Sequence, residues 1–549
     1  MSFMILVIAA STGASQSLTL TDVQNIIAQA VSKAVAMNQK VTVSVSDKEG
    51  NLLGTFQMTG APAMTLIRSV GRAGQGLENL SVSSTAAAQS KAGTAGLLSS
   101  GGNAFTTRTA SFIIQEHFPP GIDNTPGGPL YGVQFSTLPC SDVAIAGQPL
   151  GLSGDPGGLP LYKNGVAVGG IGVESNGLYT VDRDPADDDL SPEESIAAYG
   201  QRGFEPPDII KADNILVAGI RLPYANPVDM ASAAAIAFGS LPGTVTTGLR
   251  AAPVSDFVSG SVNGVSGQFS SRFPTIAGSN LTAAEVTQAL GVGIDTANRV
   301  RAAIRQPIGS NTRVTVAVTD VDGKVLGIFR SFDAPVFGLD VAVQKARTSG
   351  FFARTDAGSK LTTAGFGSYV TRASSDGIAL NGSVAFSDRA IGFLHRPLFP
   401  DGINDTAAGP FSTQLADWSP FNNGLQLDLV KNALTSPPMV CSSAAIRRRR
   451  MMMLAAPCPC TAVAEMRNGA QIFAGGLPIY RGSTYIGAVG VSGDGIEQDD
   501  IIAAFASGNF APATGIRSDN TFVRTVRLPF LKFPARPFLD SLTGVSNPK

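Results

Sequence analysis

Apolar residues near the start of the chain recur at the spacing of an amphipathic helix. The repeating positions are Val23, Ile26, Ile27, Ala30, Val31 and Ala34. Residues at this spacing lie on one face of a helix, so the pattern predicts a helix with one face in a core. Thr19 and Asp22 have the spacing of a capping box, which predicts that the helix begins there. Thr282 and Glu285 repeat that spacing and predict a second such helix.

The first predicted helix is followed by the period-two alternation that is typical of strands. The alternating apolar residues are Val41, Val43 and Val45. Asp47 and Gly50 follow as turn residues, so this segment predicts a β-hairpin. The hairpin sequence at 41–56 returns at 314–329.

Four further blocks repeat in the same order. The matched ranges are 91–94 with 345–348, 118–129 with 399–410, 158–162 with 476–480, and 221–224 with 527–530. A long period that occurs twice indicates a duplicated domain, because solenoid repeats are only tens of residues long. We therefore predict a first domain at 18–260 and a second at 275–549, each with a C-terminal extension. Residues 1–17 form a signal-like segment ahead of them.

Each copy also contains two more helices and a closing hairpin. The helices are expected at 86–97 and 192–199 in the first copy, and at 339–349 and 497–505 in the second. Helices segregated around antiparallel hairpins predict an α+β fold, with a largely antiparallel sheet packed with helices in each domain. Insertions between the matched blocks are expected on surface loops. One insertion contains the Arg- and Met-rich run at 447–453.

Charge is sparse along these 549 residues. Asp, Glu, Lys and Arg make up 15% of the chain and the net charge is −1, against roughly 25% charged residues in ordinary soluble domains. This balance predicts neither a nucleic-acid surface nor an anionic-membrane surface. So few charges favour a surface covered by a partner, and we expect a homo-oligomer.

The apolar run at 3–10 resembles the hydrophobic region of a secretory signal, although no Lys or Arg precedes Lys33. We expect export to the periplasm or the cell exterior, with a cytoplasmic protein as the alternative. No apolar run reaches the ~18 residues of a membrane span. In an exported protein, Cys140 and Cys441 could form a disulfide. No Cys-x-x-Cys-His motif is present, which excludes conventional covalent c-type haem attachment.

The order of these parts resembles the GlcG/HbpS-like haem-binding family. Its members have a V-x-V-x-D-x-x-G-x-L hairpin, a helix with Lys-Ala-x-Thr, and a glycine-rich closing hairpin. The second copy matches the closing motif at 475–493, whereas the first departs from it after Val173, at Glu174. The resemblance implies a compact sheet-and-helix domain that commonly assembles into oligomers. It also implies haem as a cofactor, which some relatives bind and degrade.

Haem needs an apolar slot, an axial ligand, and cations near its propionates. The chain has two histidines, His117 and His395, and neither is shared, since the other copy has Leu398 and Ile114 at these positions. An equivalent His-ligated haem in each domain is therefore not supported. Each histidine is a ligand candidate, with an exposed loop histidine as the alternative for His117.

The shared polar residues are the other candidates. They are Lys91, Thr94, Arg108 and Tyr162 in the first copy, and Lys345, Thr348, Arg389 and Tyr480 in the second. The Lys–Thr pairs could hold a propionate or small carboxylate, or be a snorkelling lysine and a core threonine. The arginines could bind an anion or pair with Asp123 or Asp388. The tyrosines could ligate iron as phenolates or pack as aromatics.

We expect a non-enzymatic protein that binds haem or another small anionic ligand. Its slot would lie between the lysine helix and the loop before the closing hairpin. Peroxide-dependent haem degradation is one alternative, and an assembly protein with decayed ligand sites is another. Phosphate-loop, Gly-x-Ser-x-Gly and His-Glu-x-x-His motifs are absent, so hydrolysis and phosphoryl transfer have no support.

Overall fold

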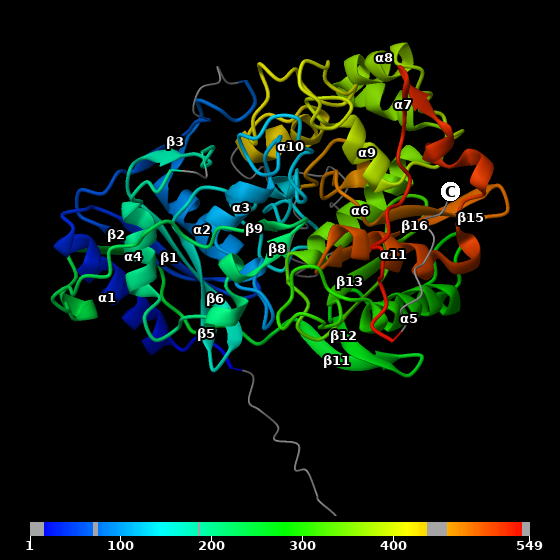
Figure 1. Cartoon of the computed structure of the whole chain (residues 1–549). Coiled ribbons are helices and arrows are strands. Elements are labelled where there is room, and N and C mark those ends of the chain that lie inside the picture. Colours follow the sequence, from blue (N-terminus) through cyan, green and yellow to red (C-terminus); the bar gives the residue numbers. More distant parts are fainter. Residues whose placement is uncertain (1–15, 70–74, 185–186, 436–457, 541–549) are drawn as a thin grey trace, which may run out of the picture.

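The computed structural model describes residues 16–69, 75–184, 187–435 and 458–540. Two sheet-and-helix bodies lie side by side, one blue to cyan-green and the other green to red (Figure 1). We call residues up to 247 the first half and residues from 257 the second half. Most of the signal-like segment, Cys441 and the run at 447–453 lie outside the described residues.

The first half contains a five-stranded antiparallel sheet in the order β10-β2-β1-β6-β5. Its strands are β1 (Thr42–Asp47), β2 (Leu52–Met58), β5 (Gly158–Lys163), β6 (Val166–Glu174) and β10 (Gly243–Thr247). Helices α1 (Leu20–Ala36) and α4 (Pro192–Gly200) pack on one face, and α2 (Ser84–Leu97) packs on the other. The capping box of Thr19 and Asp22 is confirmed.

The second half repeats this sheet in the order β12-β14-β13-β16-β15, with β11 added outside β12. Its strands are β11 (Phe257–Val262), β12 (Val265–Ser270), β13 (Val314–Thr319), β14 (Val325–Arg330), β15 (Gly476–Arg481) and β16 (Thr484–Gly493). Its helices are α5 (Ala283–Arg299), α6 (Gly338–Phe352) and α11 (Ile496–Ser507). The capping box of Thr282 and Glu285 is also confirmed.

The strand registers of the two sheets agree. Val43 lies opposite Val173 in the first sheet, and Val316 lies opposite Val491 in the second. The sequence matches therefore correspond to equivalent places in space, and the expected α+β class with antiparallel sheets is confirmed. The hairpin β11–β12 pairs with β14, so its first residues belong to the second sheet, whereas the sequence placed 257–260 in the first domain.

Glycines in the closing strands allow a helix to approach closely. A Cβ on Gly172 would lie 2.2 Å from the Ala88 carbonyl oxygen of α2. A Cβ on Gly490 would lie 1.9 Å from the Ala342 carbonyl oxygen of α6. Any side chain at either position would clash with helix backbone, so these glycines serve packing.

Smaller elements connect the repeated parts. The helices are α3 (Thr107–Ile113), α7 (Ala357–Leu361), α8 (Gly367–Ser375), α9 (Asp388–Leu394) and α10 (Leu425–Thr435). The strands are β3 (Met64–Ile67), β4 (Ser81–Ser83), β7 (Leu178–Tyr179), β8 (Leu216–Val217), β9 (Ile220–Arg221), β17 (Phe522–Val523) and β18 (Val526–Arg527). Both β8–β9 and β17–β18 are two-stranded sheets just before an Arg-Leu-Pro tail.

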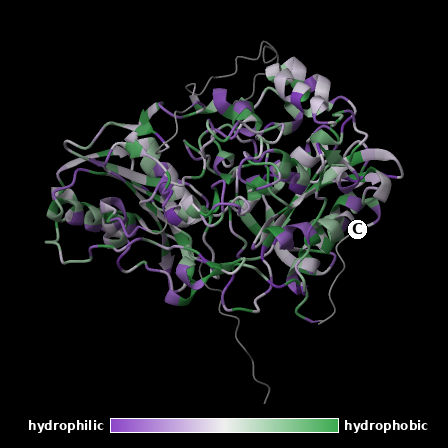
Figure 2. Ribbon diagram, turned by 45° about the horizontal axis from the view of Figure 1, so that its top comes forward, coloured by the Kyte–Doolittle hydropathy of each residue, from purple (hydrophilic) through white to green (hydrophobic). Residues whose placement is uncertain are grey.

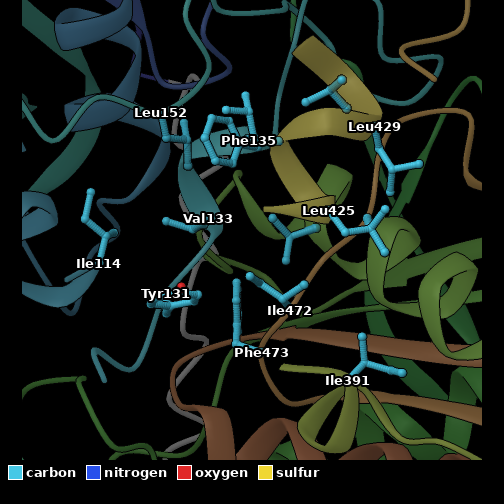
Figure 3. Close-up of a cluster of buried hydrophobic side chains, with 14 of the residues drawn as sticks. Ile114, Tyr131, Val133, Phe135, Leu152, Ile391, Leu425, Leu429, Ile472 and Phe473 are labelled. Atoms are coloured by element: carbon cyan, nitrogen blue, oxygen red, sulfur yellow. The ribbon is translucent and has the colours of Figure 1, made fainter. Parts of the chain in front are cut away.

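Each half has its own apolar core behind its sheet, and many strand residues are hydrophobic (Figure 2). A third, larger cluster joins the two halves. Figure 3 shows part of it, with Tyr131 and Val133 of the first half near Leu425 and Ile472 of the second. The halves therefore share a core in addition to their own. In the described part of the chain, none of the helices has the length and apolar content needed to cross a bilayer.

The insertion that carries α10 was expected on the surface, and this expectation is wrong for its described part. Leu425, Leu427 and Val430 are buried in the shared cluster. The physical reason is that buried residues occur on more than one side of α10, which packs against Val133–Phe135 of the first half.

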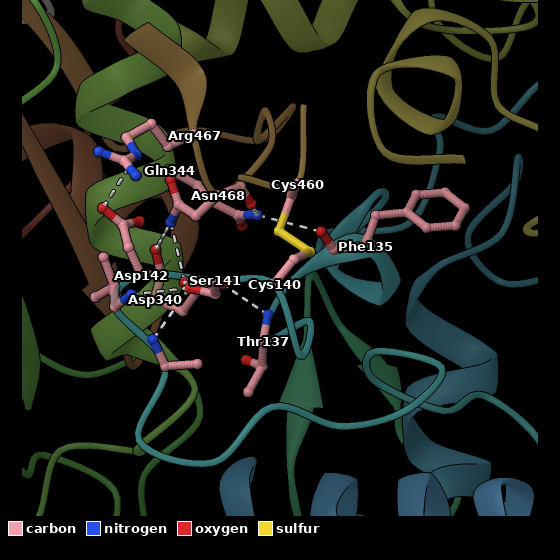
Figure 4. Close-up of a disulfide and its surroundings, with 12 residues drawn as sticks. Phe135, Thr137, Cys140, Ser141, Asp142, Asp340, Gln344, Cys460, Arg467 and Asn468 are labelled. Atoms are coloured by element: carbon pink, nitrogen blue, oxygen red, sulfur yellow. Dashed lines mark hydrogen bonds and ion pairs between the residues drawn. A yellow bond between two sulfur atoms is a disulfide. The ribbon is translucent and has the colours of Figure 1, made fainter. Parts of the chain in front are cut away.

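A disulfide joins the halves, but not through the expected pair. Cys140 is bonded to Cys460 rather than to Cys441 (Figure 4). The loop around Cys140 lies against α6, where the Asp340 carboxylate accepts hydrogen bonds from the Thr137 amide and the Ser141 hydroxyl. This docking holds Cys140 beside the segment that carries Cys460. No described cysteine is free.

Candidate functional site

The duplicated basic residues pair with two adjacent carboxylates on the helix after each closing hairpin. The ion pairs are Lys91–Glu193 at 2.6 Å, Arg108–Glu194 at 2.7 Å, Lys345–Asp499 at 2.9 Å and Arg389–Asp500 at 2.5 Å. The two halves therefore share one arrangement, in which the first acid of the adjacent pair faces the lysine and the second faces the arginine.

Sequence reasoning missed these acids. The offset from Glu193 to Asp499, and from Glu194 to Asp500, equals the offset from Arg221 to Arg527. This shared offset could have identified the acids as duplicated residues. The expected partners of the arginines, Asp123 and Asp388, are wrong. The acids lie in or near the first helical turn, where the helix dipole favours negative charge.

In the first half, the Lys91 ammonium lies among three carboxylates. Its Nζ is 2.7 Å from Asp155, 3.0 Å from Glu174 and 2.6 Å from Glu193, with the lysine side chain fully buried. These carboxylates are close enough to one another to hold a metal ion, but the ammonium already lies among them. The Thr94 hydroxyl donates to the Ser90 carbonyl, so the Lys–Thr pair here is part of the core.

The cluster has more acids than cations. Burial disfavours the charge of Lys91, but the three carboxylates outweigh it and raise its pKa. Burial also raises the pKa of Asp155, and it raises that of Glu174 to about 7, with Lys91 acting in the opposite sense on both acids. Because one ammonium cannot balance three carboxylates in a buried site, the cluster holds protons near neutral pH.

In the second half, an aromatic ring replaces one carboxylate. Lys345 Nζ pairs with Asp499 and lies 4.3 Å from the centre of the Phe473 ring. Burial raises the pKa of Asp499 to about 7, and Lys345 opposes this shift. The Thr348 hydroxyl donates to the Gln344 carbonyl, so this threonine also serves packing.

Two cavities adjoin one another between the halves. Their volumes are about 610 Å³ and about 400 Å³. Both are lined by Pro126, Pro129, Arg389, Arg396, Asp401, Ile496 and Lys532. Since the prolines come from the first half and the other residues from the second, we call the two cavities together the central cleft. Each cavity falls in the size range of small-molecule sites, about 300–1,000 Å³.

The cleft has apolar walls. Phe393, Phe473, Leu528 and Phe530 line the larger cavity, and Leu98, Phe105, Phe118 and Phe337 line the smaller one. Phe473 covers Lys345 at this wall, so the lysine itself does not line the cleft. Of the two elements expected around the slot, the loop before the closing hairpin lines the cleft and α6 does not.

Arg389 is the sequence candidate that the structure places in the cleft. Its Nε donates to Asp500, while its Nη2 is buried and has no hydrogen-bond partner. Arg396 also lines the cleft, with its guanidinium 4.2 Å from the centre of the Tyr131 ring and its Nη1 without a hydrogen-bond partner. Buried donors without partners are costly, so both guanidiniums have unused hydrogen-bonding capacity next to the cleft.

The matching arginine of the first half is covered. Arg108 is only 3% exposed and pairs with Glu194, Asp182 and Asp189. Asp182 and Asp189 belong to the acidic segment at 182–194, where the first copy is longer than the second. This segment gives Arg108 carboxylate partners in addition to Glu194, so the two halves are not equivalent.

The histidines and tyrosines lie away from the cleft lining. His117 is 7% exposed, and its Nδ1 is 2.8 Å from the Thr125 carbonyl oxygen. The expectation of an exposed loop histidine is therefore wrong. His395 Nδ1 is 2.7 Å from the Ile391 carbonyl oxygen, and burial lowers the pKa of His395 to about 3.

The two tyrosines pack in the interior. The Tyr162 hydroxyl donates to the carbonyls of Ser100 and Asn103. Tyr480 packs edge-on against Tyr485, and burial raises the pKa of Tyr480 to about 12. Both residues fit the packing alternative.

The cleft fits the organic part of a tetrapyrrole. It offers apolar walls, a suitable volume, and the cations Arg389, Arg396 and Lys532 for carboxylates. Among the described residues that line the two cavities there is no His, Cys, Met or Tyr. The usual protein ligands of haem iron are therefore not part of the described lining.

Comparison with known proteins identifies part of the second half. Residues 433–507 match the family described as haem degrading protein HbpS-like. This match includes the closing hairpin, α11 and the acids Asp499 and Asp500. The region is thus HbpS-like, while the family model does not extend to the first half. No curated protein matches the chain.

Solved structures are similar over about a third of the chain. A PduOC:heme complex has 18% identity and a TM-score of 0.22, covering 38% of this chain and 99% of its own. Klebsiella pneumoniae protein ORFY has 22% identity and a TM-score of 0.22, covering 37% and 96%. A double mutant of HbpS from Streptomyces reticuli has 21% identity and a TM-score of 0.20, covering 37% and 97%.

Proposed function

We propose that this protein binds haem or another small anionic ligand in the central cleft, without catalysing its breakdown. The observation that carries the proposal is Arg389, whose buried Nη2 has no partner at the edge of an apolar cavity of about 610 Å³. The HbpS-like match of 433–507 supports a haem-related ligand at the level of the family.

The proposal assigns separate tasks to the parts of the cleft. The apolar walls exclude water from the ring system of the ligand, and Arg389 and Arg396 hold its carboxylates. A haem would supply its own iron chemistry when bound. The carboxyls with raised pKa values, Glu174 and Asp499, are buried against lysines rather than lining the cleft, which supports binding without acid–base catalysis.

Titration of the purified full chain with hemin tests this function. We expect a shifted Soret band that saturates at one hemin per chain, because only the second-half arginine faces the cleft. Bleaching of this band by peroxide with release of iron would instead support haem degradation. No spectral change at any hemin concentration would exclude haem binding and favour an assembly role.

We also propose that the protein is exported. The oxidised state of Cys140 and Cys460 supports an oxidising compartment. Fractionation of cells that express the full chain tests this proposal, with the expected protein in the periplasm or the medium. Homo-oligomerisation stays a prediction from the low charge content, and light scattering of the purified chain tests it.

A further inference from the structure

We propose that the central cleft recognises the carboxylates of its ligand rather than a metal, so that it binds a tetrapyrrole with or without iron. This inference rests on the proposed ligand binding in the cleft. It adds that the carboxylates of the ligand, rather than a metal ion, determine which ligands bind. The chemical class is an apolar, planar molecule with carboxylates along one edge.

The charges of the cleft lining support an anionic ligand. Four cations, Arg389, Arg396, Arg527 and Lys532, line the central cleft, together with three acids, Asp401, Glu497 and Asp519. Lys532 pairs with Glu497 and Arg527 pairs with Asp519, which leaves Arg389 and Arg396 as the main cations of the lining. Arginine suits carboxylates because its planar fork can donate two parallel hydrogen bonds.

Each of the two inner arginines has a buried donor that makes no hydrogen bond within the described protein. Arg389 uses Nε toward Asp500, and its Nη2 has no hydrogen-bond partner. Arg396 Nε lies 3.5 Å from the Asp401 carboxylate, and its Nη1 has no hydrogen-bond partner. Both side chains are mostly buried, at 17% and 11% exposure, so an anion that reaches them is shielded from water.

The described lining offers less to a metal ion than to carboxylates. Both histidines of the chain lie outside it. Iron could therefore gain little affinity from this lining. Free energy of binding should come from the apolar ring system and the carboxylates, which hemin and metal-free protoporphyrin IX share.

Three ligands separate these contributions. Hemin carries iron and two carboxylates, protoporphyrin IX carries the carboxylates alone, and protoporphyrin IX dimethyl ester carries neither iron nor free carboxylate. Binding can be followed by quenching of Trp418, the only tryptophan of the chain. Trp418 stacks on Tyr131, whose other contacts include the Arg396 guanidinium, so the reporter lies close to the cleft.

We expect the Kd values of hemin and protoporphyrin IX to agree within about threefold. The dimethyl ester should bind at least tenfold more weakly, which corresponds to about 1.4 kcal/mol. Hemin binding at least tenfold tighter than protoporphyrin IX would overturn this inference while leaving the proposed function intact. Equal binding of the ester and the free acid would also overturn it. Absence of quenching by all three would refute the proposed function itself.

Two variants test whether the affinity for hemin and protoporphyrin IX depends on cations of the cleft. Arg389→Gln and Lys532→Gln should each weaken hemin and protoporphyrin IX in parallel, by about tenfold and about threefold. Lys532 is 61% exposed, so its replacement should leave the fold intact even if Arg389→Gln does not. Arg481→Gln is the control, since this 52% exposed arginine pairs with Glu285 outside the cleft lining. Unchanged affinity in both cleft variants would overturn the inference.

Discussion

Asp155 and Phe473 occupy corresponding positions in the two halves, beside the duplicated lysines. Asp155 Oδ2 lies 2.7 Å from Lys91 Nζ, and the centre of the Phe473 ring lies 4.3 Å from Lys345 Nζ. One position thus provides a buried carboxylate in the first half and an apolar wall of the central cleft in the second. This exchange, together with the acidic segment over Arg108, explains why Arg389 lines the central cleft and Arg108 does not.

Phe473→Asp should therefore give the second half the character of the first. The new carboxylate would pair with Lys345, so the fold should persist, but the cleft would lose a wall and gain negative charge. We expect hemin affinity to fall at least tenfold, about 1.4 kcal/mol, as measured by absorbance titration. Phe473→Leu is the matched control and should lose less than about threefold. Equal affinity in the two variants would contradict this role of Phe473.

Lys91→Met should destabilise the protein without changing ligand affinity. Removal of the ammonium leaves three buried carboxylates without their cation, at a cost on the order of 3–5 kcal/mol near neutral pH. Urea denaturation measures the loss, and hemin titration should give a Kd within about twofold of the parent. Lys163→Met removes the partly exposed pair with Asp22 and should cost less than about 1 kcal/mol. A large loss of affinity in Lys91→Met would restore this lysine as an anion anchor.

Glu174→Gln should stabilise the protein above about pH 7 and change little near pH 5. Burial raises the pKa of Glu174 from 4.5 to about 7. The folded protein therefore binds more protons than the unfolded chain between these values, and the contribution of Glu174 to stability falls as the pH rises.

The stability difference at about pH 8 should be on the order of 3 kcal/mol at most. Lys91 keeps its pairs with Asp155 and Glu193 in this variant, so no buried cation is left alone. Unfolding in urea across the pH series measures the effect. If the variant and the parent lose stability in parallel as the pH rises, Glu174 does not titrate in this range.

Replacement of Cys140 and Cys460 by serine should lower the stability of the protein, because it removes the covalent link between the halves. Their disulfide spans 320 residues of sequence, and loss of a native disulfide typically costs about 2–4 kcal/mol. We expect a lower unfolding midpoint and faster proteolysis of the loop near Cys140. Because Asp340 and Arg347 still hold this loop against α6, the halves should remain docked. An unchanged midpoint would show that these contacts alone suffice.

Several local features could be predicted from the sequence. The capping boxes at Thr19 and Thr282, the paired hairpins and the α+β class follow from residues that are neighbours in the chain. Such patterns depend on local backbone preferences and on which face of an element is apolar. Duplication reinforced them, because each element was seen twice in the same order.

The candidate site could be predicted only in part. Arg389 was identified as an anion-binding candidate, but its partner Asp500 and its neighbour Lys532 were not. The sequence left the lysines open between an anion site and packing, because no local pattern shows that Lys91 meets Asp155, Glu174 and Glu193. Those carboxylates come from a loop, a strand end and a later helix.

The sequence by itself determined the order of elements and their repetition, since capping, alternation and turns arise from contacts within a few residues. Tertiary structure alone decided that the first half covers its arginine with Asp182 and Asp189 while the second leaves Arg389 facing a cleft. It also decided the Cys140–Cys460 bond and the shared core. These outcomes depend on which distant segments pack together, and the resulting burial raises the pKa of Glu174 and Asp499.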